Sequence, residues 1–132
     1  MHLFGDRDKP HLVHFEAQRE RGSVVLTWDV RNAPALSWRV LRSERGFAET
    51  ADALPGSGQT VVMEGADTRV TDDPLAEGTT YYYAVFAQDE RGAWHRLVKV
   101  KLKSHEHGDW TYPRSDSSPY FSELELRMPR GR

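Results

Sequence analysis

The strongest constraint on the fold of this chain comes from short runs in which apolar side chains recur at every second residue. In residues 23–30, SVVLTWDV, Val24, Leu26 and Trp28 share one face, and residues 93–103 alternate apolar residues with lysines. This period is that of a β-strand with one buried face. Gly, Pro, Asn and Asp interrupt the runs at short intervals, which is typical of an all-β sandwich or barrel.

About seven strands are expected, and the sequence contains no amphipathic helix long enough to compete with them. They cover residues 12–17 (as an edge strand), 23–30, 36–43, 60–64, 68–71, 79–89 and 93–103. Residues 105–119 are polar and contain Gly, Pro and Ser throughout, whereas residues 120–128 regain enough alternation for a further strand. We therefore expect a lead at residues 1–9, one domain at residues 10–104 and a tail at residues 105–132.

Composition excludes several classes of function. The chain has 132 residues, enough for one domain, and no cysteine, so disulfides and thiolate chemistry are excluded. Its net charge of −2 argues against general electrostatic binding of nucleic acid. The apolar runs are far too short to span a membrane, and charges stand where an export signal needs an apolar stretch. Gly56-Ser57-Gly58 lacks the lysine of a phosphate loop, and no cofactor is expected.

The clearest motif is the string Leu75-x-x-Gly78-Thr79-x-Tyr81, which is typical of a tyrosine corner, in which a tyrosine hydroxyl bonds back to upstream backbone. With this motif the chain resembles a known family, the fibronectin type III domain in its bacterial form. The resemblance covers about residues 10–104 and implies an immunoglobulin-like sandwich of two antiparallel sheets. It assigns structural roles to Trp28, Trp38, Leu75, Gly78, Tyr81 and Tyr83. Arg42, where the family often has an aromatic residue, and the long loop at residues 45–59 depart from the pattern.

The three consecutive tyrosines should be divided between two faces. If Tyr81 and Tyr83 face the core, Tyr82 faces outward. Its neighbours on that face should form an apolar patch rimmed by basic residues, a candidate interaction face made of Arg39, Leu41, Tyr82, Phe86, Leu97 and Lys99. Three alternatives stay open: the tail covers this face, an external protein binds it, or it has no role.

Metal-ligand residue types gather only in His105-Glu106-His107, with Asp109 nearby. Alternate positions of an extended chain project the same way, so both imidazoles can reach one ion. A stable site needs a third rigid ligand, and this segment has the composition of a solvated tail. We therefore expect no metal site.

No catalytic motif is present, and the resemblance implies a non-catalytic module that binds proteins or separates neighbouring domains, in a surface or secreted protein. One alternative is a carbohydrate-binding accessory module of a polysaccharide-active enzyme, with Trp94, Trp110 and Tyr112 as stacking platforms. The other is a self-associating subunit that pairs residues 120–128 with a second copy.

Overall fold

A computed structural model describes residues 11–31, 37–111 and 122–123, and within these ranges the chain is all-β. The strands are β1 (His11–Glu20), β2 (Ser23–Arg31), β3 (Trp38–Ser43), β4 (Gln59–Gly65), β5 (Arg69–Asp72), β6 (Tyr81–Gln88), β7 (Trp94–Leu102), β8 (His107–Thr111) and β9 (Ser122–Glu123). The seven strands expected from the sequence are confirmed, with ends shifted by a few residues. Across the described ranges, no helix is long and apolar enough to cross a membrane.

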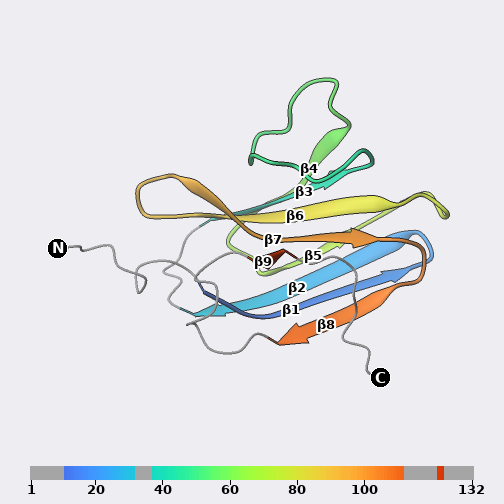
Figure 1. Cartoon of the computed structure of the whole chain (residues 1–132), viewed down its shortest axis with the longest axis horizontal. Coiled ribbons are helices and arrows are strands. Elements are labelled where there is room, and N and C mark those ends of the chain that lie inside the picture. The colour runs from blue at the N-terminus through green and yellow to red at the C-terminus, as the bar shows by residue number, and fades with distance from the viewer. Residues whose placement is uncertain (1–10, 32–36, 112–121, 124–132) are drawn as a thin grey trace.

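The strands form two stacked sheets (Figure 1). The first sheet has the order β5-β2-β1-β8 and the second has the order β4-β3-β6-β7-β9. All pairings are antiparallel except that between β7 and β9. The prediction of a two-sheet antiparallel sandwich is therefore confirmed.

The first strand is not at an edge, contrary to the sequence interpretation. β8 pairs with β1 in the register Glu16↔Asp109, so β1 lies inside the sheet. The same pairing corrects the prediction that a polar tail begins at residue 105, because residues 107–111 belong to the sheet. A short edge strand can be polar on its exposed face, so its composition resembles that of a tail. Of the strand expected at residues 120–128, only Ser122–Glu123 is described, paired with β7.

The core lies between the sheets and follows the expected alternation. Tyr81 and Tyr83 are buried and Tyr82 is half-buried. Trp28 and Trp38, both buried, meet edge to face with ring centroids 5.8 Å apart, so one tryptophan from each sheet joins the two layers. The remaining large buried side chains come from both sheets: Phe15, Val24, Leu26, Val40, Val85, Leu97, Val98, Val100 and Leu102.

The tyrosine corner is present at Tyr81. Its hydroxyl accepts a hydrogen bond of 3.0 Å from the backbone N–H of Ala76, and Leu75 packs against the core. Gly78 adopts a φ of +91°, a left-handed conformation that glycine tolerates best. Beneath the corner, the guanidinium of buried Arg19 donates to carbonyl oxygens, including those of Ala76 and Leu102, and lies 4.9 Å from the Tyr81 ring centroid. The segment that leads into β6 is thereby held by two side chains, Tyr81 and Arg19.

Arg42, the departure from the family pattern, belongs to a polar cluster at the edge of the core. Its Nη1 atom donates to both carboxylate oxygens of Asp72, at 2.8 and 2.9 Å, and the Tyr83 hydroxyl donates to the same carboxylate at 2.7 Å. Burial, and then the bond to Asp72, raises the pKa of Tyr83 far above its ordinary value. Tyr83 therefore stays a neutral hydrogen-bond donor, and Arg42 balances the charge of Asp72.

Candidate interaction surface

The predicted interaction face is the outer face of β3, β6 and β7, and its apolar part is not exposed. Leu41 and Phe86 are only 1% and 2% exposed. They pack with Ala48, Ala51 and Ala84 in a second, smaller core beneath the long β3–β4 loop (residues 44–58), which folds back over the sheet. The expectation that these residues form an open patch is wrong. Burying a side chain such as Phe86 stabilises the fold by about 1.5–3 kcal/mol, which favours this closure.

Within the described residues, the protein covers part of this face with the β3–β4 loop. Whether the tail also covers it stays a prediction, because most of the tail lies outside the described residues. Among the described residues of the tail, β9 adds to the sheet only at the edge of β7.

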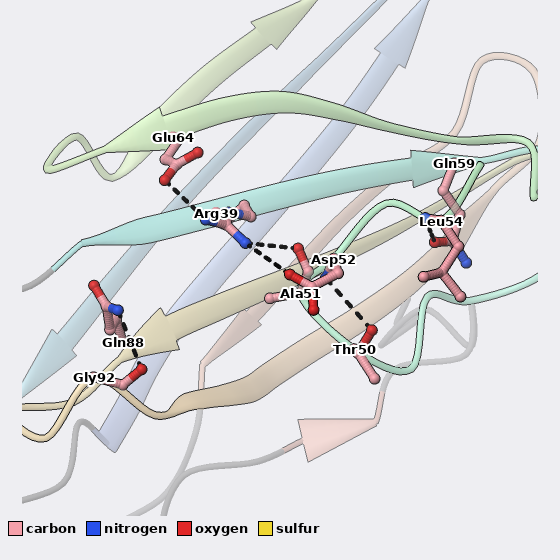
Figure 2. Close-up of polar contacts among 9 residues, drawn as sticks. All are labelled: Arg39, Thr50, Ala51, Asp52, Leu54, Gln59, Glu64, Gln88 and Gly92. Atoms are coloured by element: carbon pink, nitrogen blue, oxygen red, sulfur yellow. Dashed lines mark hydrogen bonds and ion pairs between the residues drawn. The ribbon is translucent and has the colours of Figure 1, made fainter.

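Arg39 holds the loop in place. As Figure 2 shows, it reaches from β3 to the loop, where its Nη1 atom donates to the carbonyl oxygen of Ala51 at 2.9 Å and lies 3.6 Å from the Asp52 carboxylate. Its Nη2 atom donates to Glu64 on β4 at 2.9 Å. The guanidinium also stacks 4.3 Å from the centroid of the Trp94 ring. Arg39, predicted as part of an interaction face, is thus largely engaged in fixing the loop.

A second arginine ties the loop to β7. Nη1 of Arg96 donates to the carbonyl oxygen of Ala48 at 2.8 Å. Within the loop, the Thr50 hydroxyl accepts a bond from the backbone N–H of Asp52, and at its end the amide oxygen of Gln59 on β4 accepts one from the N–H of Leu54 (Figure 2). The loop is therefore bonded both internally and to β3, β4 and β7.

Leu97 was predicted to point outward and instead lies in the main core, with no exposed area. The cause is a register shift between β6 and β7, where Val85 pairs with Val98 but Phe86 pairs with Arg96. Leu97 is the extra residue of this bulge, so the alternation reverses on its N-terminal side. Arg96 consequently takes the outward position that simple alternation assigns to Leu97.

Next to the covered part of this face lies an aromatic–basic strip, formed by Phe47, Tyr82, Lys99 and Lys101. The rings of Phe47 and Tyr82 meet edge to face with centroids 5.1 Å apart. Nζ of Lys99 lies 4.7 Å from the centroid of the Phe47 ring, and Nζ of Lys101 lies 5.8 Å from that of Tyr82. All four residues are half-buried. Tyr82 and Lys99 thus keep their predicted orientation, and the aromatic rings hold the two ammonium groups.

Phe47 was missed by the sequence interpretation because it lies in the irregular loop, where periodicity gives no information. The one available indication was compositional. Residues 47–54, FAETADAL, carry more apolar side chains than a solvated loop needs.

Comparisons with known proteins come from solved structures, since the sequence matches no protein-family model and no curated protein. The fibronectin type III domain of the human collagen α-1(XX) chain aligns with a TM-score of 0.53 and 16% identity, over 81% of this chain and 91% of that one. A Fn3-like protein from Clostridium thermocellum aligns with a TM-score of 0.51 and 24% identity, over 74% and 95%. Part of a β-1,2-glucanase from Parabacteroides distasonis aligns with a TM-score of 0.51 and 18% identity, over 74% of this chain but 13% of the enzyme.

The chain has a fibronectin type III-like fold. These neighbours place the fibronectin type III-like fold both in a chain of similar length and within a much longer enzyme.

Of the three stacking platforms expected for carbohydrate binding, only the side chain of Trp94 lies within the described structure. Trp94 is half-buried and one face of its ring is taken by Arg39. The side chain of Trp110 and all of Tyr112 lie outside the described residues. Carbohydrate binding therefore stays a prediction without geometric support.

Proposed function

We propose that this fibronectin type III-like domain is a non-catalytic protein-interaction or spacer module that makes contact through the aromatic–basic strip. The observation that carries the proposal is that Lys99 and Lys101 each hold an ammonium group against a half-buried aromatic ring. Aromatic side chains are enriched at the centre of protein interfaces, and tyrosine is among the residues that contribute most to binding.

The chemistry of the strip favours an acidic partner. Two ammonium groups already positioned on aromatic rings lose little conformational freedom when they bind carboxylates. Three residues of the strip lie on strands β6 and β7 and Phe47 lies in the fixed β3–β4 loop, so the shape of the strip changes little on binding. A segment of protein with several Asp or Glu residues next to an apolar side chain is complementary to it.

A titration with a short poly-glutamate peptide, followed by amide chemical shifts in NMR spectra, tests this proposal. We expect the largest shift changes at Phe47, Tyr82, Lys99 and Lys101. The double variant Lys99→Glu/Lys101→Glu should bind about tenfold more weakly, since partly exposed ion pairs each contribute up to about 1 kcal/mol.

The matched control is Arg21→Glu, which reverses a charge in the β1–β2 turn, where the side chain is 79% exposed. It should leave the binding unchanged. If the peptide instead perturbs the first sheet, or if Arg21→Glu weakens binding as much as the double variant does, the strip is not the contact surface.

A further inference from the structure

A polar cluster lies on the outer face of the first sheet, away from the aromatic–basic strip, where β1 meets β8. Nε2 of His14 lies 2.6 Å from Oδ1 of Asp109, and Glu16 stands directly opposite Asp109 in the strand register. The ligand atoms of these three residues all lie within 4.8 Å of one another. The fold thus brings two residues of β1 to a residue from the segment that the sequence alone suggested as a tail.

The two histidines of that segment, His105 and His107, lie apart from each other on the surface. Nε2 of His107 lies 3.0 Å from the Glu16 carboxylate, beside the cluster, whereas His105 lies 3.5 Å from Glu77 and belongs to another part of the surface. The two imidazoles of His105-Glu106-His107 therefore contact different carboxylates, Glu77 and Glu16, and Asp109 contacts His14 instead.

Two carboxylates directly opposite each other in an antiparallel pair repel, so Glu16 and Asp109 favour a positive charge between them. The donor set of one imidazole nitrogen and two carboxylate oxygens suits zinc, whereas calcium prefers a larger shell made of oxygen alone. Zinc bonds of about 2.0–2.2 Å need donor atoms roughly 3.4 Å apart. Side chains that are partly exposed, as these are, reach that spacing by small rotations.

The other ring nitrogen of His14 also has a partner. Its Nδ1 atom lies 3.7 Å from Oδ2 of Asp29 on β2. Histidines that bind metals commonly present their second nitrogen to a carboxylate, which fixes the tautomer and the orientation of the ring. Asp29 is placed to do this while Nε2 faces Asp109 and Glu16.

We propose that His14, Glu16 and Asp109 form a zinc-binding site that ties β8 to β1. A divalent ion neutralises the two facing carboxylates and links the strands through side chains as well as backbone. Because the ligands come from both strands, zinc binding stabilises the paired state and slows the separation of β8 from the sheet.

Calorimetric titration of the tag-free protein with zinc chloride tests the site. We expect one equivalent of zinc to bind. The variants His14→Ala and Asp109→Asn should each lower the affinity by at least about tenfold, the loss expected at a minimum when a ligand is removed. Calcium chloride, the matched ionic control, should give no binding. His105→Ala removes an imidazole of the same segment outside the cluster and should bind zinc like the parent.

Hydrogen exchange supplies a second test, because zinc bound elsewhere in the chain would not slow the exchange of the β8 amides. Zinc should slow the exchange of the backbone amides of β8 in the parent protein and in His105→Ala, but not in His14→Ala. In the titration, the proposal is overturned if no stoichiometric zinc binding occurs, if calcium binds as tightly, or if His14→Ala and Asp109→Asn keep the parent affinity. In the exchange measurement, it is overturned if zinc leaves the exchange of β8 unchanged. None of these results depends on the aromatic–basic strip.

Discussion

At the scale of residues, the three consecutive tyrosines show how strand geometry gives identical side chains different roles. Tyr81 closes the corner through its bond with Ala76, Tyr83 donates to Asp72 at the edge of the core, and Tyr82 alone faces outward. Nothing in the chemistry of a phenol distinguishes them. The division follows from the two-residue period of the strand and from what lies on each side of it.

The corner bond is testable by removing one oxygen atom. Tyr81→Phe leaves the N–H of Ala76 without its partner, so we expect the free energy of unfolding to fall by about 1–2 kcal/mol. Urea denaturation measures the change. The matched control is Tyr82→Phe, which should change the stability by less than about 0.5 kcal/mol. Equal losses in both variants would show that the hydroxyl of Tyr81 has no special role.

Asp89, in the β6–β7 turn, gives the stability a defined pH dependence. Burial raises the pKa of Asp89, but hydrogen bonds from His95 and from the backbone N–H groups of Ala93 and Arg91 outweigh it and bring the pKa below its ordinary value. A carboxyl group whose pKa is lower in the folded protein contributes stability above its unfolded pKa, about 3.9, and loses it as the pH falls through the folded value.

We therefore expect the parent protein to be more stable than Asp89→Asn near neutral pH, with a difference that shrinks as the pH falls below about 4. Urea midpoints of both proteins over a pH series measure this difference. A gap that stays constant, or widens in acid, would contradict the role given to the Asp89 carboxylate.

At the scale of elements, the β3–β4 loop acts as a cover over one face of the second sheet. Its alanines complete a small core with Leu41 and Phe86, and Arg39 and Arg96 bond its backbone to the strands beneath. A loop of this length is normally exposed and mobile, because its backbone groups need water. Here side-chain donors from the sheet replace part of that water.

Arg39→Ala should loosen this cover. The variant loses the bonds to Ala51 and Glu64 and the contact with Trp94, at a cost of about 1–2 kcal/mol. We expect faster hydrogen exchange in residues 44–58 and stronger fluorescence of a dye that binds exposed apolar surface. Arg45→Ala is the control, since the Arg45 side chain is exposed, its bond to the Gly56 carbonyl is long at 3.4 Å, and the backbone bond from its N–H to Ser43 stays in the variant. Unchanged exchange in Arg39→Ala would mean that the apolar contacts alone hold the loop.

At the scale of the whole molecule, residues beyond 104 join both sheets. β8 completes the first sheet beside β1, and β9 pairs with β7 in the second. The approach to β8 is also bonded, because the N–H of Arg19 donates to the carbonyl of Glu106 at 2.7 Å. Residues of apparently tail-like composition thereby protect β1 from being an exposed edge.

Shortening the chain tests this arrangement. A form ending at Ser104 loses β8 and leaves backbone groups of β1 unpaired, so its free energy of unfolding should fall by more than about 2 kcal/mol. A form ending at Thr111 keeps β8 and should lose much less. Guanidinium denaturation of the three lengths compares them. If the form ending at Thr111 were as unstable as the shorter one, β8 would not be the stabilising element.

Seven of the strands, the inward positions of Tyr81 and Tyr83 and the tyrosine corner could be predicted from the sequence, because each depends on residues close together in the chain. The strand β8 could not. Trp28, Trp38, Tyr81 and Tyr83 lie where alternation and the Leu-x-x-Gly-Thr-x-Tyr motif predict them. Such features need only a local backbone conformation and one buried side.

What lies over and beside those strands depends on contacts that form only when distant segments come together. Leu41 and Phe86 are covered by a loop without periodicity, and Leu97 is turned inward by a bulge that depends on how β6 and β7 pair. His14 and Asp109, 95 residues apart, meet because β8 pairs with β1. These outcomes depend on contacts between distant segments, whose energies are summed over the whole fold, and no short stretch of sequence encodes them.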